Sequence, residues 1–132
     1  MVEQDYITRL ISGNIRTILK LVFQIEANQE DNIELEDEET AQKYIRLTDL
    51  INAGKINEAE NILIEELDYS DIKQFEMALK FYSYLNDIDL DFLEECNYTK
   101  KEIVEGIKDM SKMYGYGGLT TSFLDIDSFE KS

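Results

Sequence analysis

The sequence contains no histidine, no proline and no tryptophan, and only one cysteine and six glycines among its 132 residues. Without histidine, a Ser-His-Asp or Cys-His catalytic arrangement, an imidazole-bound zinc and the Glu-x-x-His pair of di-iron bundles are all excluded. The single cysteine, Cys96, cannot form an internal disulfide, and the neighbouring Glu94 and Glu95 disfavour a reactive thiolate. We therefore expect no catalytic residues, no cofactor and no bound metal.

Long apolar runs and basic residues are also scarce. No run approaches the ~18 residues of a membrane span, and the acidic Glu3 and Asp5 replace the basic start of a signal peptide. The 13 Lys and Arg against 29 Asp and Glu give a net charge of −16. Because nucleic acids and anionic membranes require basic side chains for binding, we expect neither as a partner. The composition predicts a cytoplasmic protein whose partner is a protein, preferably a basic one.

The abundant residues favour helices. Leu, Ile, Glu, Lys and Asp are plentiful, and the absence of proline removes the strongest helix breaker. A chain of this length fits one domain, which can bury about two-thirds of its unfolded surface. We predict an all-α fold of five main helices and one short helix, with a single helical domain over residues 1–115 and a flexible tail over residues 116–132.

A long amphipathic helix is predicted over residues 3–26. Its apolar residues recur in steps of three and four, which places them on one face: Ile7, Ile11, Ile15, Ile18, Val22 and Ile25. Arg9, Arg16 and Lys20 fall on the opposite face. We interpret the apolar stripe as part of the core, and the alternative is a seam through which two copies form a homodimer. Gly13 is a candidate for a close helix crossing.

Residues 27–39 are rich in acids and lack helical periodicity, which predicts a mobile linker. A cation site is the alternative for this segment, although no turn glycine organises its carboxylates. Asp37 or Thr40 is expected to cap the helix that follows. Residues 40–115 are then predicted to form a core of antiparallel helical hairpins.

The segment LTDLINAGKINEAENILIEEL (residues 47–67) predicts two short helices folded back to back around Gly54, the expected left-handed stop. Asn57 is expected to cap the second helix, with Glu60 at the reciprocal position of a capping box. The hairpin resembles one tetratricopeptide repeat, because small or apolar residues stand at matching spacings: Leu47, Leu50, Gly54, Ala59 and Leu63.

Ser70 or Asp71 is predicted to open a further helix that runs to about Asn86 and carries most of the aromatic residues. Its inward face is expected to hold Ile72, Phe75, Ala78, Leu79 and Tyr82. Phe81 and Tyr84 fall on other faces. They are candidates for an aromatic binding surface, and partial burial against neighbouring helices is the alternative.

A short helix over residues 90–96 is expected to end at Asn97. Thr99 and Glu102 have the spacing of a capping box, which predicts a last helix that ends at Gly115. The inward stripe of this helix is expected to comprise Ile103, Ile107, Met110 and Tyr114.

Several motifs together resemble those of a family of small, uncharacterised bacterial all-helical proteins. They are EQDYITR (3–9), GKINEAE (54–60), FYSYL (81–85) and NYTKKEIVEGI (97–107), with Met110 and Tyr114-Gly115. The resemblance spans roughly residues 3–115 and leaves the tail uncovered. It implies a bacterial cytoplasmic all-α protein with a repeat-like core, and it assigns no functional residues.

We interpret the chain as a non-catalytic protein-interaction or adaptor domain rather than an enzyme. The hairpin core would supply a rigid surface, and the acidic exterior would select a basic partner. The candidate interaction surface comprises Arg9, Arg16, Lys20, Phe81 and Tyr84.

Two other functions stay open at this point. A metal-dependent all-α nucleotide hydrolase would hold magnesium between pairs of carboxylates, for which the candidates are Asp91, Glu94, Glu102, Glu105 and Asp109. Only seven residues separate Glu94 from Glu102, which makes it difficult for two facing helices to present both pairs. An acidic decoy that imitates nucleic acid would instead capture DNA-binding proteins in a salt-sensitive manner.

Overall fold

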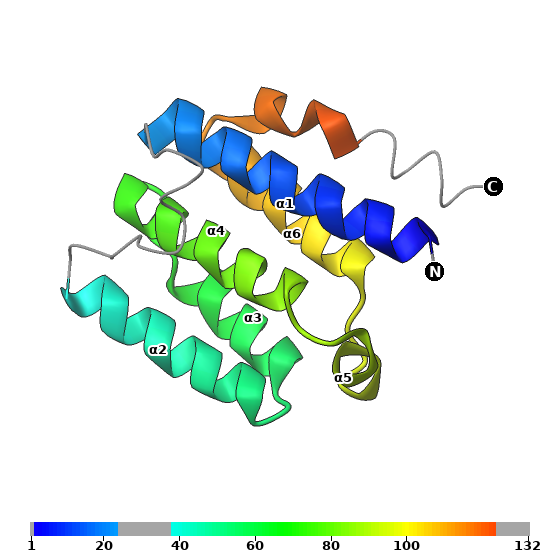
Figure 1. Cartoon of the computed structure of the whole chain (residues 1–132). Coiled ribbons are helices and arrows are strands. Elements are labelled where there is room, and N and C mark those ends of the chain that lie inside the picture. The colour runs from blue at the N-terminus through cyan, green and yellow to red at the C-terminus, as the bar shows by residue number, and fades with distance from the viewer. Residues whose placement is uncertain (1, 24–37, 124–132) are drawn as a thin grey trace.

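The computed structural model describes residues 2–23 and 38–123, which form helices joined by short loops and contain no strand. Five longer helices and one short one confirm the predicted fold class (Figure 1). The elements are α1 (Val2–Phe23), α2 (Glu38–Asn52), α3 (Ile56–Glu66), α4 (Ile72–Asn86), α5 (Leu90–Glu95), α6 (Lys100–Met113) and the 3₁₀ helix η2 (Gly117–Phe123).

Helix α4 is the centre of the fold. It packs against α1, α2 and α6, and in Figure 1 it lies between the α2–α3 hairpin and α1. More than half of its 15 residues are buried: Phe75, Met77, Ala78, Leu79, Phe81, Tyr82, Leu85 and Asn86. A helix buried on so many sides cannot show the single apolar stripe of a surface helix.

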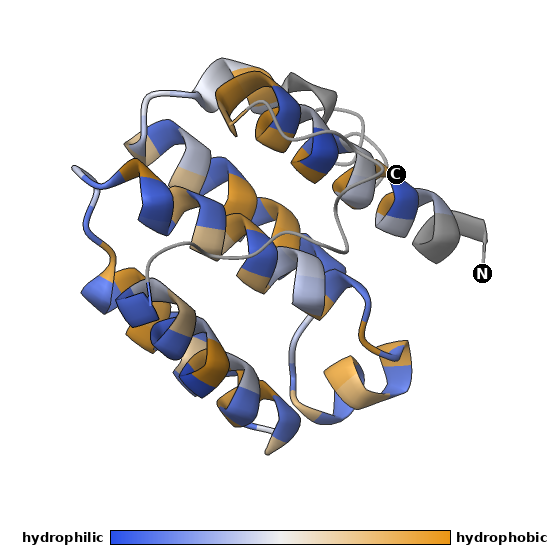
Figure 2. Ribbon diagram, turned by 60° about the vertical axis from the view of Figure 1, so that its left-hand side comes forward, coloured by the Kyte–Doolittle hydropathy of each residue, from blue (hydrophilic) through white to orange (hydrophobic). Residues whose placement is uncertain are grey.

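Helix α1 completes this core, as the first of the two readings of its apolar stripe predicted. Ile7, Ile11, Ile15 and Ile18 are all buried, and α1 packs against α4, α6 and η2. Its apolar face is therefore covered by its own chain, and a homodimer through this helix stays a prediction. Figure 2 shows the hydrophobic residues alternating with hydrophilic ones along each helix. Residues 24–26 of the predicted helix lie outside the described residues.

Three helices end where the sequence predicts. Gly54, Asn97 and Gly115 all have a positive φ (84°, 56° and 88°). The backbone N–H of the residue that follows each of them donates a hydrogen bond to the carbonyl five residues earlier, as Lys55 N–H does to Leu50 O at 2.9 Å. These bonds satisfy carbonyls that the helix end would leave without a donor.

Two helix starts are confirmed in detail. The Asp71 carboxylate accepts a hydrogen bond from Lys73 N–H at 3.0 Å, so Asp71 caps α4. At the start of α6, the Thr99 hydroxyl accepts from Glu102 N–H at 3.2 Å, and the Glu102 carboxylate accepts from Thr99 N–H at 2.8 Å. This reciprocal pair is the predicted capping box.

One predicted cap is wrong, and a second prediction loses one of its two candidates. Helix α2 begins at Glu38, so Thr40 lies inside the helix, where it is buried, and Glu38 and Glu39 belong to α2 rather than to the linker. Asp37 and the other residues of the proposed linker, with its cation site, lie outside the described residues. Helix α3 begins at Ile56, so the predicted cap Asn57 is wrong: it lies inside the helix, and its amide donates to the Cys96 carbonyl at 3.3 Å. Lys55 is the residue at the cap position, and it makes no side-chain cap.

The domain does not stop at residue 115. Residues 117–123 form η2, which packs against α1 and α6, and the Asn14 side-chain amide donates to the Leu119 carbonyl at 2.8 Å. The predicted flexible tail is therefore wrong for this stretch, and residues 124–132 lie outside the described residues.

Ile72 also departs from prediction: it is 41% exposed, because it is the first residue of α4 and lies beyond the core.

The close helix crossing lies at Gly106 rather than at Gly13. A Cβ built on Gly106 would stand 2.4 Å from the hydroxyl end of the buried Tyr82, so the ring of Tyr82 occupies the space that any larger residue needs. A Cβ on Gly13 would meet nothing within 4 Å. Gly106 is thus required by packing between α4 and α6, whereas Gly13 is not.

These two glycines make a matched pair of variants. Gly106→Ala should lower the free energy of unfolding by about 1–3 kcal/mol, because the buried Tyr82 ring cannot move away. Gly13→Ala should raise it by about 0.5–1 kcal/mol, since alanine loses less backbone entropy in a helix. Urea unfolding of both variants checks the expectation, and a Gly106→Ala protein as stable as the wild type would contradict it.

Candidate functional site

A small hollow lies between α2, α3 and α4. The space in it that a water-sized molecule can occupy is about 10 Å³, and its apolar wall includes Leu47, Leu63 and Met77. Arg46 and Glu66 stand at its rim and form an ion pair of 2.7 Å, with both side chains about half exposed. Because pockets for small molecules usually measure about 300–1,000 Å³, this hollow is far too small to be one.

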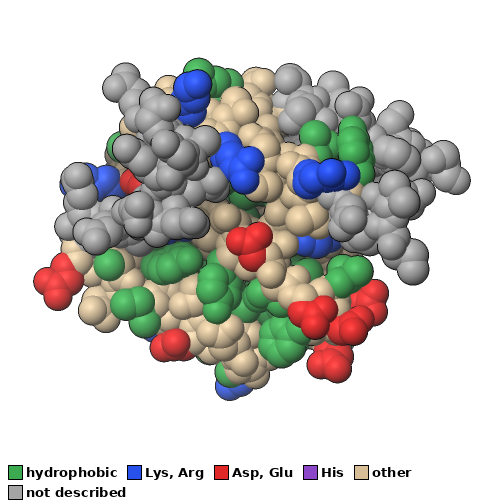
Figure 3. All heavy atoms as spheres, in the orientation of Figure 1, with side chains coloured by type: hydrophobic (Ala, Val, Ile, Leu, Met, Phe, Trp, Pro, Cys, Tyr) green, Lys and Arg blue, Asp and Glu red, His purple; other side chains and the backbone are tan. Residues whose placement is uncertain are grey.

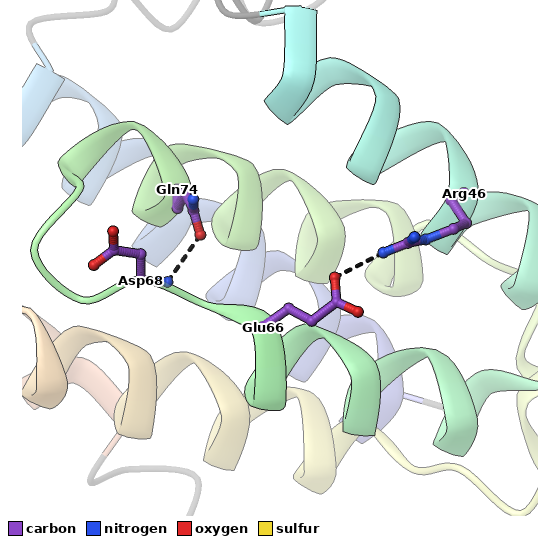
Figure 4. A network of polar contacts seen from close by, with 4 residues as sticks. All are labelled: Arg46, Glu66, Asp68 and Gln74. Carbon is purple, nitrogen blue, oxygen red and sulfur yellow. Dashed lines mark hydrogen bonds and ion pairs between the residues drawn. The ribbon is translucent and has the colours of Figure 1, made fainter.

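The polar contacts beside this hollow hold a loop in place (Figure 4). The Gln74 side-chain carbonyl accepts from Asp68 N–H at 2.9 Å, and the Asp68 carboxylate accepts from both the N–H and the hydroxyl of Ser70. These bonds from Ser70 lower the pKa of Asp68 below its ordinary value. They fix the turn between α3 and α4, which is a structural role.

A second cluster joins α3, α4 and α6 around Glu60. The Tyr82 hydroxyl donates to Glu60 Oε2 at 2.7 Å. The Tyr98 hydroxyl faces the same carboxyl group without the geometry of a hydrogen bond, and it has no other partner among the described residues. Tyr82 and Tyr98 are almost wholly buried, whereas Glu60 is half-buried and reaches the surface. One carboxyl group thus stands above two buried phenols.

The surroundings of Glu60 disfavour the negative charge of its carboxylate. Burial raises the pKa of Glu60, and the carboxylates of Glu102 and Asp109 raise it further, although hydrogen bonding to the phenols acts in the opposite direction. Burial and the nearby Glu60 raise the pKa values of Tyr82 and Tyr98 well above that of free tyrosine. Both phenols therefore remain protonated donors at every physiological pH.

A third polar group lies inside the core. The buried Lys100 donates from Nζ to the Asn86 backbone carbonyl at 2.7 Å and to its side-chain oxygen at 2.9 Å. The Asn86 amide in turn donates to the Thr8 carbonyl at 3.0 Å, so the relay connects α6, α4 and α1. Burial lowers the pKa of Lys100, and the nearby carboxylate of Asp87 counters part of that effect. We interpret this relay as a structural connection that holds the three helices together inside the core.

The five residues predicted to form an interaction surface do not come together. Arg9, Arg16 and Lys20 are exposed on α1, as expected, and Figure 3 shows Lys and Arg side chains spaced over α1 while acidic ones gather over α5. Phe81 was wrongly placed at the surface, because it is fully buried against Tyr82 with ring centres 5.2 Å apart.

Tyr84 is half-buried, and its hydroxyl donates to the Asn52 side-chain oxygen at 2.8 Å, which ties α4 to α2. The predicted surface therefore reduces to the three basic residues of α1, with Tyr84 elsewhere on the molecule.

Sequence reasoning missed the cluster around Glu60. It assigned Glu60 to a capping box and Tyr82 to the core, and it gave Tyr98 no role. The three residues are 22 and 16 positions apart, so no local spacing joins them. The available signal was Gly106, a glycine on the inward face of a helix. A glycine there indicates that a side chain of a neighbouring helix packs directly against the backbone.

The carboxylates proposed for a hydrolase do not form a metal centre in the structure described. Within residues 2–23 and 38–123, no three Asp, Glu, Cys or His side chains lie close enough to hold a metal ion. Over the same residues, no helix has the length and apolar character needed to span a membrane.

A family model of unknown function, DUF6483, matches residues 1–115. The chain belongs to this family. The match covers nearly the same residues as the resemblance noted in the sequence, and η2 lies just beyond its end. No curated protein and no solved structure matches the chain at a significant level. The likeness of the α2–α3 hairpin to a tetratricopeptide repeat therefore stays a prediction.

The buried relay gives a test of its structural role. Asn86→Ala should lower the free energy of unfolding by about 1–3 kcal/mol, because the Thr8 carbonyl loses its donor and Lys100 loses one acceptor inside the core. Asn61→Ala, on the exposed face of α3, is the control and should change it by less than about 0.5 kcal/mol. Equal stability of the two variants would contradict this structural role.

The raised pKa of Glu60 predicts a dependence of stability on pH. A carboxyl group whose pKa is higher in the folded state binds protons more readily there, so its contribution is fully present below pH 4.5 and is lost as pH rises through the folded pKa. Glu60→Gln removes this loss and can still accept from Tyr82. Relative to wild type, the variant should therefore gain stability between pH 4 and pH 7, measured by urea unfolding; a constant difference would contradict the prediction.

Proposed function

We propose that this protein is a non-catalytic protein-interaction domain. The observation that carries the proposal is the basic row of Arg9, Arg16 and Lys20, which we call the α1 row. All three side chains are exposed, on a helix whose opposite face is anchored in the core. In a chain of net charge −16, this row is a face of opposite sign held on a rigid support.

Exposed apolar side chains at one end of the bundle support the same reading. Phe75 contacts Phe23 (6.0 Å between ring centres) and stacks on Tyr114 (4.7 Å), which brings together the end of α1, the start of α4 and the end of α6. Large apolar side chains near these rings remain exposed: Leu21, Ile72, Met113 and Tyr116. Apolar side chains gathered at a surface are common where proteins bind one another.

The alternatives have less support. The hydrolase requires a metal centre, and the described residues provide no such group. The nucleic-acid decoy rests on net charge alone, whereas the α1 row interrupts the acidic surface that a decoy needs. The bacterial and cytoplasmic setting, implied by the resemblance and by the single cysteine, stays a prediction.

Charge reversal on α1 tests the proposal. A variant carrying Arg9→Glu, Arg16→Glu and Lys20→Glu should retain at least tenfold less of any protein captured by the wild type from native cell extract, because each partner carboxylate then meets a like charge. The measurement is quantitative mass spectrometry of the captured protein, with circular dichroism to verify helicity.

The control variant carries Arg46→Glu, Lys55→Glu and Lys101→Glu, which change the net charge by the same amount at exposed positions outside both the α1 row and the exposed apolar side chains named above. It should bind as the wild type does. Equal loss in both variants would assign the effect to net charge, and loss of helicity in the first would assign the α1 row to the fold; either result contradicts the proposal.

A further inference from the structure

Aromatic rings hold one end of the helical bundle together. The ring of Phe75, which is fully buried, stacks on Tyr114 at 4.7 Å and on Tyr116 at 5.9 Å between ring centres. Phe23 lies 6.0 Å from Phe75, and Tyr69 lies 5.3 Å from Tyr114. These contacts join the end of α1, the start of α4 and the end of α6. We call this part of the molecule the aromatic end.

Exposed apolar side chains are concentrated at the aromatic end. Leu21 of α1, Ile72 of α4 and Met113 of α6 are 61%, 41% and 57% exposed, and each lies within one helical turn of a ring in the cluster. Tyr116, itself one of the rings, is 36% exposed. Of the six large apolar side chains that are more than a third exposed in the described residues, four therefore lie at this end. Such a concentration is typical of a binding surface.

Each of the three helix ends also carries an exposed lysine next to its exposed apolar residue: Lys20, Lys73 and Lys112. None of these lysines forms an ion pair with a described residue. Two acids lie in the adjoining loop, but Asp71 accepts from a backbone N–H at the start of α4, and Asp68 accepts from two donors of the loop itself. The aromatic end thus combines apolar side chains with positive charges that the fold does not use.

We propose that the aromatic end and its three lysines bind an acidic segment of a partner protein that carries apolar side chains between its carboxylates. This inference rests on the proposed interaction function, to which it adds a contact surface and a partner chemistry. Lys20 belongs to both surfaces, so the α1 row continues into the aromatic end. Apolar side chains of the segment would cover Ile72 and Met113, and the neighbouring carboxylates would pair with the lysines.

Charge favours this partner over a second copy of the chain and over a membrane. Two copies that met through the aromatic end across a two-fold axis would bring the same lysines together, and like charges repel. An anionic membrane is an extended surface, so it would also come within the ~8 Å screening length of many acids in a chain of net charge −16. A short acidic segment meets only the aromatic end.

The test is an NMR titration of the full-length protein with a short blocked peptide in which phenylalanine and leucine alternate with aspartate and glutamate. The methyl signals of Ile72 and Met113 and the ring signals of Tyr116 should shift saturably. Those of Ile45 and Ile64, which are exposed on α2 and α3, should stay in place. The Kd should rise at least fivefold between 20 and 200 mM NaCl, because the lysine contacts are exposed to screening.

Two control peptides separate charge from apolar contact. The first carries asparagine and glutamine in place of the acids, and the second carries serine in place of phenylalanine and leucine. Each should bind at least tenfold more weakly than the acidic apolar peptide, because the proposed surface requires both kinds of contact.

Charge variants locate the contact. Lys73→Gln combined with Lys112→Gln should raise the Kd of the acidic apolar peptide about fivefold, the effect of losing two exposed ion pairs. Lys55→Gln combined with Lys101→Gln removes the same charge elsewhere on the surface and should change the Kd less than twofold. Lys20 is not substituted, because it also belongs to the α1 row.

Apolar variants test the other half of the surface. Ile72→Ser combined with Met113→Ser should raise the Kd about tenfold, because the peptide then buries less apolar area. The matched control, Ile45→Ser combined with Ile64→Ser, should change it less than twofold. All four side chains are exposed, so both variants should keep the helicity of the wild type, measured by circular dichroism.

Three results would overturn the proposal. They are equal binding of either control peptide, equal effects of the variants and their matched controls, and shifts of the same signals by phosphatidylserine vesicles or by raised protein concentration but not by the acidic apolar peptide. If one of these occurs while the α1 charge reversal still abolishes capture, the aromatic end fails as a site and the interaction function stands. If the α1 reversal also has no specific effect, both proposals fail together.

Discussion

The fold depends on one close approach, in which Tyr82 of α4 crosses α6 at Gly106. No residue with a Cβ fits there, since the hydroxyl end of the ring would lie 2.4 Å from it. The crossing lets α4 pack between α2 on one side and α1 and α6 on the other, and it carries the Tyr82 hydroxyl through to Glu60 on α3. A single packing contact thus sets both the arrangement of the core and the position of the most unusual polar group in the protein.

The sequence predicted the parts of the fold that depend on neighbouring residues. The ends at Gly54, Asn97 and Gly115, and the capping box of Thr99 and Glu102, require only local backbone geometry, and all are present. Burial was predicted less well where it depends on several helices at once. Phe81 lies off the main apolar stripe of α4 yet is fully buried, because α4 has neighbours on several sides.

Long-range contacts explain most of the remaining errors. The sequence after Gly115 contains glycines and few apolar residues, and it gave no sign that residues 117–123 would pack against α1 and α6. The hydrogen bond from Asn14 to Leu119 joins residues 105 positions apart, so no local pattern predicts it. The same holds for the candidate site, where Glu60, Tyr82 and Tyr98 come from three separate segments. Only the basic face of α1 could be read in advance, because its residues share one helix.

The α1 row keeps its positive charge in a strongly acidic chain. The side chains of the α1 row point away from the core, so at least the ~10 Å diameter of α1 lies between them and the interior. The screening length at physiological ionic strength is about 8 Å, and exposed charges beyond it interact weakly. Exposed acids that lie farther than this from the α1 row therefore lower its potential little, although the net charge of the chain is −16. The charge of the α1 row is therefore set by its own helix and not by the composition of the whole chain.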